Sequence, residues 1–158
     1  MALRGVQRAT IDLDFILMLE DLDRADAILV VAGYEKKFRS ENVSHYRSKN
    51  CDFGRIDILH AFRGPTLNML KRADRIEVAD GLSLPVVQLE DIIGLKVQAA
   101  INDPKRHAGD WSDIRIIVES AAGQAIQLDW ELLRSYLEIF DLTEQLSEIK
   151  EWYGKIDG

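Results

Sequence analysis

Two carboxylates at alternate positions of one apolar segment are the residues of this sequence best placed to do chemistry. Asp12 and Asp14 lie in residues 11–19, which begin by alternating apolar and polar side chains and end wholly apolar. That pattern is typical of a β-strand whose first half has one wet face. Successive side chains of a strand point to opposite faces, so both carboxylates emerge on one face, about 7 Å apart. Oxygen ligands at this spacing suit Mg²⁺ or Mn²⁺.

A third carboxylate, Asp57, stands between Ile56 and Ile58 in another alternating segment, residues 55–60. On a neighbouring strand it would complete a bridging set for one or two metal ions. Such a set holds a nucleoside triphosphate for phosphoryl or nucleotidyl transfer, because metal ions neutralise phosphate charge and align the reacting oxygens. The alternative is that Asp-x-Asp only marks the solvent face of a half-buried strand.

The elements that must position these acids form an α+β fold. Alternation predicts strands at residues 11–19, 34–40, 43–48 and 55–60, which make a small mixed or antiparallel sheet with helices on one face. We expect the first strand to be central, with Leu13 and Phe15 facing inward. Residues 76–87 are expected to be extended, with a turn at Asp80-Gly81.

Helical spacing of apolar residues predicts helices at residues 20–32, 66–72, 89–101 and 110–122, and two more beginning near Asp129 and Asp141. Residues 1–87 are therefore expected to form an α/β core, and residues 88–158 a helical part. That part is either a subdomain or one wall of a single domain.

The length, net charge and cysteine content of the chain limit the functions that it can have. It has 158 residues, a formal net charge of −7 and a single cysteine, Cys51, which excludes an internal disulfide and suits a reducing cytoplasm. We expect neither export nor a membrane span, because no leader-like run and no long apolar segment occurs. The acidic balance argues against generic binding of polyanions. Residues 34–50 nevertheless hold five basic side chains against two acidic ones, and are read as a solvated sheet edge or as a guide for RNA.

The run Gly5-Val-Gln-Arg8-Ala-Thr10-Ile-Asp12-Leu-Asp14 resembles the segment Gly-x-x-Arg-x-Thr-x-Asp-x-Asp of the minimal nucleotidyltransferase family. That family shares the DNA polymerase beta fold and includes abortive-infection toxins encoded beside antitoxins. The resemblance covers about residues 2–118. It implies a Mg²⁺-dependent transfer of a nucleotide from a nucleoside triphosphate to an RNA or protein acceptor.

The resemblance also assigns roles to single residues. It implies that Asp57 is the third carboxylate and that Gly5 is a supporting residue. Arg8 either reaches phosphate or caps the edge of the sheet, and Thr10 is a β-branched residue that enters the strand. Lys96 lies on the apolar stripe of its helix, seven residues after Leu89. Three explanations stay open for it: snorkelling along apolar neighbours, pairing with Asp110 or Asp113, or contact with a bound triphosphate.

The chain departs from the family at one point. Family members carry a glycine-rich turn upstream of the Gly-x-x-Arg segment, whose backbone N–H groups cradle the triphosphate, and this sequence shows no such turn before Gly5. We therefore expect either a start that lies late in the domain or a degenerate member. A degenerate member would act as a protein-interaction component, for example as one half of a toxin and antitoxin pair.

Overall fold

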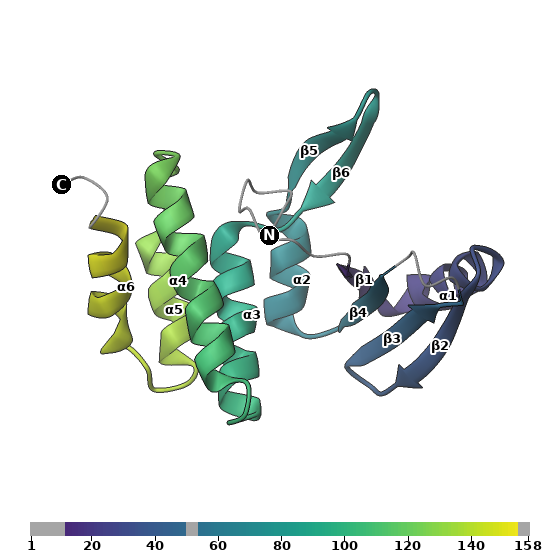
Figure 1. The fold of residues 1–158 in the computed structure, drawn as a ribbon, viewed down its shortest axis with the longest axis horizontal. Coiled ribbons are helices and arrows are strands. Elements are labelled where there is room, and N and C mark those ends of the chain that lie inside the picture. Colours follow the sequence, from purple (N-terminus) through teal and green to yellow (C-terminus); the bar gives the residue numbers. More distant parts are fainter. Residues whose placement is uncertain (1–11, 50–53, 155–158) are drawn as a thin grey trace. The chain divides into compact units, whose positions relative to one another are not determined.

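The computed structural model describes residues 12–49 and 54–154. In these residues the protein is α+β, with a four-stranded mixed sheet, a two-stranded sheet and six α-helices (Figure 1). The predicted class, small mixed sheet and helical second half are confirmed. No helix of the described part is long and apolar enough to cross a membrane.

The first compact unit ends at Arg72 and contains the four-stranded sheet. Its elements are β1 (Leu13–Met18), the 3₁₀ helix η2 (Leu19–Asp21), α1 (Leu22–Val31), β2 (Tyr34–Arg39), β3 (Val43–Ser48), β4 (Arg55–Ala61) and α2 (Gly64–Lys71). The strand order is β1-β4-β3-β2. β1 runs parallel to β4, and the other two pairings are antiparallel.

Helix α1 covers one face of this sheet. Its Leu22 is buried against Tyr46, Ile56 and Ile58, which point from β3 and β4 to the same side because they alternate with polar neighbours. Gly33 follows the end of the helix in the left-handed region, at φ 86°, a conformation that favours glycine. The opposite face of the sheet, here called the open face, carries Asp14 of β1, His45 and Arg47 of β3, and Arg55 and Asp57 of β4.

The prediction that β1 is a central strand is wrong. In the described part of the chain β1 pairs with β4 alone and forms an edge of the sheet. Leu13 and Phe15, expected to face inward, are 54% and 40% exposed. The reason is that the α1 core gathers over β3 and β4, so the start of β1 lies at its rim. A continuous apolar run indicates a strand but does not fix its place in the sheet.

The second compact unit begins at Ala73. It contains a hairpin, β5 (Asp74–Ala79) and β6 (Leu82–Val86), and the helices α3 (Leu89–Asn102), α4 (His107–Gly123), α5 (Trp130–Glu138) and α6 (Gln145–Gly154). The hairpin turns at Gly81, with φ 73°, as predicted. The helices share one core, whose fully buried members include Val97, Ile117, Val118 and Ile149.

Two boundaries differ from the sequence prediction. The compact units divide after Arg72 rather than after residue 87, because β5 and β6 pair with each other and not with the four-stranded sheet. Asp129 caps α5 as expected, since its carboxylate accepts hydrogen bonds from the N–H groups of Glu131 and Leu132. Asp141 does not cap α6, which begins later, at Gln145, and Asp141 itself adopts a positive φ of 56°.

Candidate active site

Asp14 of β1 and Asp57 of β4 lie side by side. The parallel pairing sets Leu13 against Ile56, Asp14 against Asp57 and Phe15 against Ile58. Neighbouring strands are about 4.8 Å apart, so the Asp14 and Asp57 side chains leave adjacent backbones on the same open face. The register therefore joins two carboxylates that are distant in sequence.

Asp12 belongs to the same face but is joined to the sheet through Arg55. Asp12 Oδ1 accepts a hydrogen bond of 2.9 Å from the backbone N–H of Arg55. The Arg55 guanidinium then reaches both acids, with Nε 3.1 Å from Asp57 Oδ2 and Nη2 3.6 Å from Asp12 Oδ2. Arg55 thus places its charge between two of the three predicted metal ligands.

His45 of β3 binds Oδ1 of Asp57, the carboxylate oxygen that Arg55 does not contact. The antiparallel register sets His45 against Asp57, and His45 Nδ1–H donates to Asp57 Oδ1 at 2.6 Å. An ionised carboxylate only accepts hydrogen bonds, so the Nδ1 nitrogen carries the proton. Asp57 is only 20% exposed in its side chain and is oriented by both His45 and Arg55.

The sequence prediction missed the roles of His45 and Arg55. Arg55 stands two residues before Asp57, so strand alternation alone would have put both on one face. His45 carried no such local signal, because its contact with Asp57 depends on how β3 registers against β4. That register is set by long-range packing.

The donor chemistry of this face suits Mg²⁺, which prefers carboxylate oxygens. Asp12, Asp14 and Asp57 would be its ligands. In the described residues, however, no three acidic, histidine or cysteine side chains are gathered closely enough to hold a metal ion. The Arg55 guanidinium contacts an oxygen of each of two of these acids, Asp12 and Asp57.

Lys96 lies in the other unit, on α3, and forms an ion-pair cluster with α4. Its ammonium is 2.6 Å from Asp113 Oδ2 and 3.2 Å from Asp110 Oδ1. Arg106 also faces Asp110, with Nε 3.3 Å from Oδ2, although no described residue makes a hydrogen bond to that oxygen. Of the three explanations for Lys96, the structure thus shows pairing with both aspartates.

A second ion-pair cluster lies on the α1 face of the sheet. Lys36 donates to Asp26 of α1 at 2.7 Å, and the Tyr46 hydroxyl donates to the same carboxylate at 3.1 Å. The bond from Lys36 holds the pKa of Asp26 below its ordinary value. Burial, with help from Asp26, raises the pKa of Tyr46. This cluster fastens β2 and β3 to α1 and leaves the open face to other residues.

The remaining predicted site residues, Gly5, Arg8 and Thr10, lie outside the described residues. The comparisons with known proteins found no family model that matches the chain and no curated protein that matches its sequence.

Proposed function

We propose that the protein is a Mg²⁺-dependent nucleotidyltransferase whose active site is the open face formed by β1 and β4. The observation that carries the proposal is the register of Asp14 with Asp57, with Asp12 one alternation earlier. Chance alternation accounts for the acids of each strand, but it does not set the register that places Asp57 directly opposite Asp14. The likeness of residues 5–14 to the minimal nucleotidyltransferase segment supports the same activity.

In the proposed reaction an acceptor hydroxyl attacks the α-phosphorus of a nucleoside triphosphate. The new phosphorus–oxygen bond forms as the bond to the bridging oxygen of the β-phosphate breaks, and pyrophosphate leaves with that electron pair. The carboxylates of Asp12, Asp14 and Asp57 would hold Mg²⁺, and the ion would neutralise the negative charge of the phosphates. The acceptor is an RNA or protein hydroxyl.

Asp57 is placed to take the proton of the attacking hydroxyl. Its carboxylate is held by His45 Nδ1–H at 2.6 Å, so one oxygen is fixed while the other faces Arg55. When Arg55 turns away, that second oxygen becomes available to a metal ion or to the hydroxyl proton. Arg8 and Lys96 remain proposed phosphate-binding residues, and for Lys96 this requires release from Asp110 or Asp113.

Calorimetry with ATP, CTP, GTP and UTP in Mg²⁺ tests this function. We expect at least one nucleotide to bind, and Asp12→Asn to abolish the heat because it removes a ligand oxygen's charge. Asp23→Asn is the matched control, since Asp23 is 94% exposed in its side chain and projects from α1. Absence of binding by every nucleotide would count against the proposal.

One observation favours a second function, that of a degenerate nucleotidyltransferase fold that binds a partner protein. Arg55 satisfies Asp12 and Asp57 without any metal, as expected where an ion pair has replaced a metal site. This function predicts a stable partner encoded nearby that copurifies with the chain. It also predicts that crystals soaked in Mn²⁺ show no ion at Asp12, Asp14 and Asp57, whereas an ordered ion there would refute it.

A further inference from the structure

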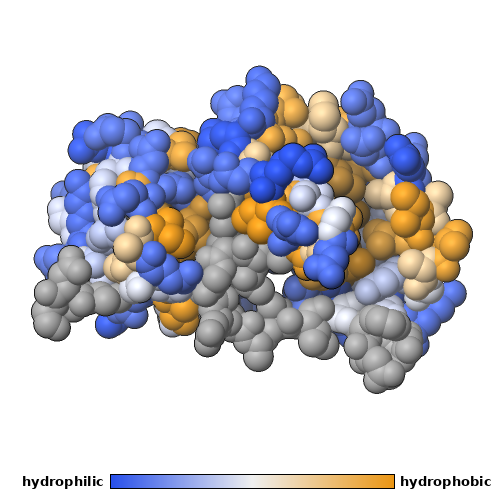
Figure 2. Space-filling view, turned by 90° about the horizontal axis from the view of Figure 1, so that it is seen from above, coloured by the Kyte–Doolittle hydropathy of each residue, from blue (hydrophilic) through white to orange (hydrophobic). Residues whose placement is uncertain are grey.

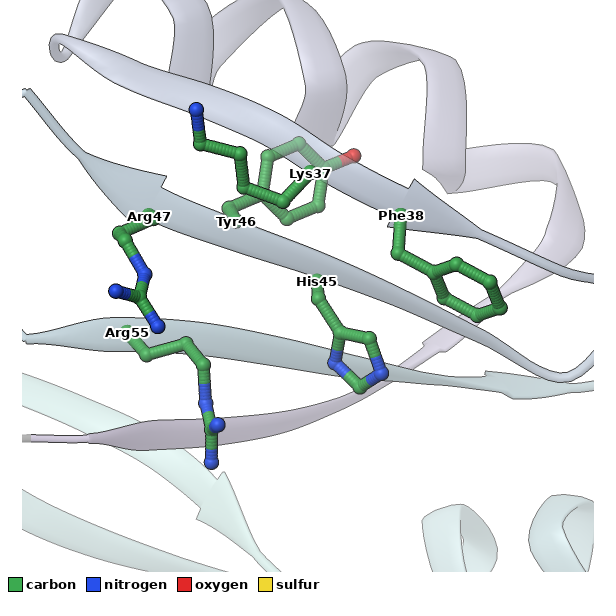
Figure 3. A pocket seen from close by; sticks show the side chains of 6 residues that line it. All are labelled: Lys37, Phe38, His45, Tyr46, Arg47 and Arg55. Carbon is green, nitrogen blue, oxygen red and sulfur yellow. The ribbon is translucent and has the colours of Figure 1, made fainter.

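We propose that the open face of β2 and β3 binds single-stranded nucleic acid, with a base stacked on Phe38 and a phosphate held by Arg47. We further infer that the bound nucleic acid is the acceptor of the proposed transfer. That identification rests on the proposed function, whereas the binding itself does not. The site is a cavity of about 190 Å³ lined by Lys37, Phe38, His45, Tyr46, Arg47 and Arg55 (Figure 3).

Phe38 is an aromatic residue that a bulge brings to the open face. β2 pairs with β3 with a register shift between Lys36 and Phe38, so that Phe38 lies opposite His45. Without the extra residue Lys37, strict alternation would set Phe38 opposite Ser44, which is buried on the α1 side. The bulge instead leaves Phe38 51% exposed, stacked on the His45 ring at 5.4 Å and 25°.

An exposed aromatic ring on a sheet suits a nucleobase. Stacking is tolerant of base identity because every base has a π face, and single-strand binders use aromatic side chains in this way. His45 stacks on one face of the Phe38 ring and leaves the other face for a base. Asp57 in turn holds the His45 ring in place. The stack is thus held rigid before a base arrives.

Arg47 supplies the positive charge beside this stack. It is exposed, and it forms no ion pair with any residue in the described ranges. The β3–β4 register sets it directly opposite Arg55. Arg55 is already paired with Asp12 and Asp57. Glu35, which the β2–β3 register sets on the other side of Arg47, is paired with Lys37. Arg47 is therefore the guanidinium of this face that is left to bind an anion. A phosphate suits the planar guanidinium of arginine, which can donate two parallel hydrogen bonds to two phosphate oxygens.

The spacing of the two features suits one nucleotide. His45 and Arg47 are two residues apart on β3, which is about 7 Å, and their side chains share one face. Figure 3 shows both reaching over the same side of the strand as Arg55, with the Phe38 ring beside His45. Base and phosphate would therefore be held along the strand direction.

Two other basic residues of this hairpin, Lys36 and Arg39, do not belong to the site. Lys36 binds Asp26 on the α1 face, and Arg39, which the register sets opposite buried Ser44, lies 3.6 Å from Asp23. Their charge serves the sheet's attachment to α1. Arg39→Gln is accordingly a matched control for Arg47→Gln: each removes one guanidinium from the same hairpin, but from opposite faces.

The test is fluorescence anisotropy with a short labelled single-stranded RNA at low salt in EDTA. We expect Phe38→Ala and Arg47→Gln each to weaken binding by about tenfold, as loss of one stacked base or one phosphate contact does. Arg39→Gln should stay within about twofold of the wild type, and Arg47→Gln alone should lower the salt slope by about one. Thermal melts check that the exposed substitutions leave the fold intact.

Three results would overturn the inference: no binding by the wild type, equal loss in Arg39→Gln and Arg47→Gln, or competition by AMP as effective as that by the RNA. The first two remove the site, and the third reassigns it to free nucleotides. Because EDTA and the absence of triphosphate exclude catalysis, this assay measures binding alone. RNA binding here, together with no nucleotide transfer in a separate assay that contains Mg²⁺ and all four triphosphates, would refute the proposed transferase and leave this site standing.

Discussion

Arg55 Nε lies 3.1 Å from Asp57 Oδ2, on the open face where Asp14 is the neighbour of Asp57 across the parallel strands. The ion pair means that a cation already occupies part of the proposed metal site. Two guanidinium contacts and a backbone hydrogen bond tie Arg55 to the acids. A metal ion and Arg55 should therefore compete for the same oxygens.

Arg55→Gln should strengthen Mn²⁺ binding by about tenfold. Removing a positive charge about 4 Å from the ion relieves on the order of 1 kcal/mol or more of repulsion near a protein surface. Titration followed by the paramagnetic signal of free Mn²⁺ measures the affinity. Arg47→Gln is the control, because Arg47 does not contact the carboxylates, and it should change the affinity much less. Equal or weaker Mn²⁺ binding by Arg55→Gln would show that Arg55 does not compete with metal.

Gly94→Ala should destabilise the protein by about 1–3 kcal/mol, the usual cost of overpacking. A Cβ atom at Gly94 would lie 2.6 Å from Cγ of Tyr136, whose hydroxyl is fixed by Asp91 at 2.8 Å. Urea unfolding measures the change. Gly109→Ala in α4, where the added Cβ would meet nothing within 4 Å beyond its chain neighbours and its own helical backbone, should instead leave stability unchanged or raise it by up to about 1 kcal/mol. A similar response of the two variants would contradict the packing account.

Lys96→Met should cost about 3 kcal/mol of unfolding free energy. The substitution keeps the apolar stem but leaves Asp110 and Asp113, whose side chains are 4% and 12% exposed, without their shared cation. Lys105→Met, an exposed change in the same α3–α4 region, should be within about 0.5 kcal/mol of the wild type. A loss below about 1 kcal/mol would leave Lys96 available for phosphate without structural cost.

The cluster of Asp26, Lys36 and Tyr46 should make stability depend on acid pH. Because the bond from Lys36 lowers the pKa of Asp26 in the folded protein, this carboxylate contributes stability above its unfolded pKa of about 3.9. That contribution is lost as the pH falls through the lower folded value. Asp26→Asn should be less stable at neutral pH and should show a shallower loss below about pH 4. Urea unfolding at a series of pH values measures this, with Asp23→Asn retaining the wild-type slope.

The sequence alone located the helices and strands, but it did not show which strands pair with each other. Alternation and helical spacing depend on nearby residues, so β1–β4, the β5–β6 turn and the helices were predictable. The edge position of β1 was not, because it depends on which strands pair, and so on packing between distant segments.

The candidate site shows the same division. Asp12 and Asp14 share a face by local geometry, whereas the meeting of Asp14 with Asp57 and of Asp57 with His45 requires two registers. The bulge that exposes Phe38 was not predictable from the sequence either. A one-residue shift between β2 and β3 decides whether that ring is buried or exposed.

The most direct test of the transferase is transfer of label from nucleoside triphosphates labelled at the α-phosphate. Wild-type protein and Asp14→Asn would be incubated with Mg²⁺, each nucleotide in turn, and a pool of RNA and protein acceptors. The wild type should label an acceptor and release an equal amount of pyrophosphate with at least one nucleotide, and Asp14→Asn should give neither product. Labelling by Asp14→Asn at the wild-type level, or none by the wild type with any nucleotide, would contradict the proposed role of the three carboxylates.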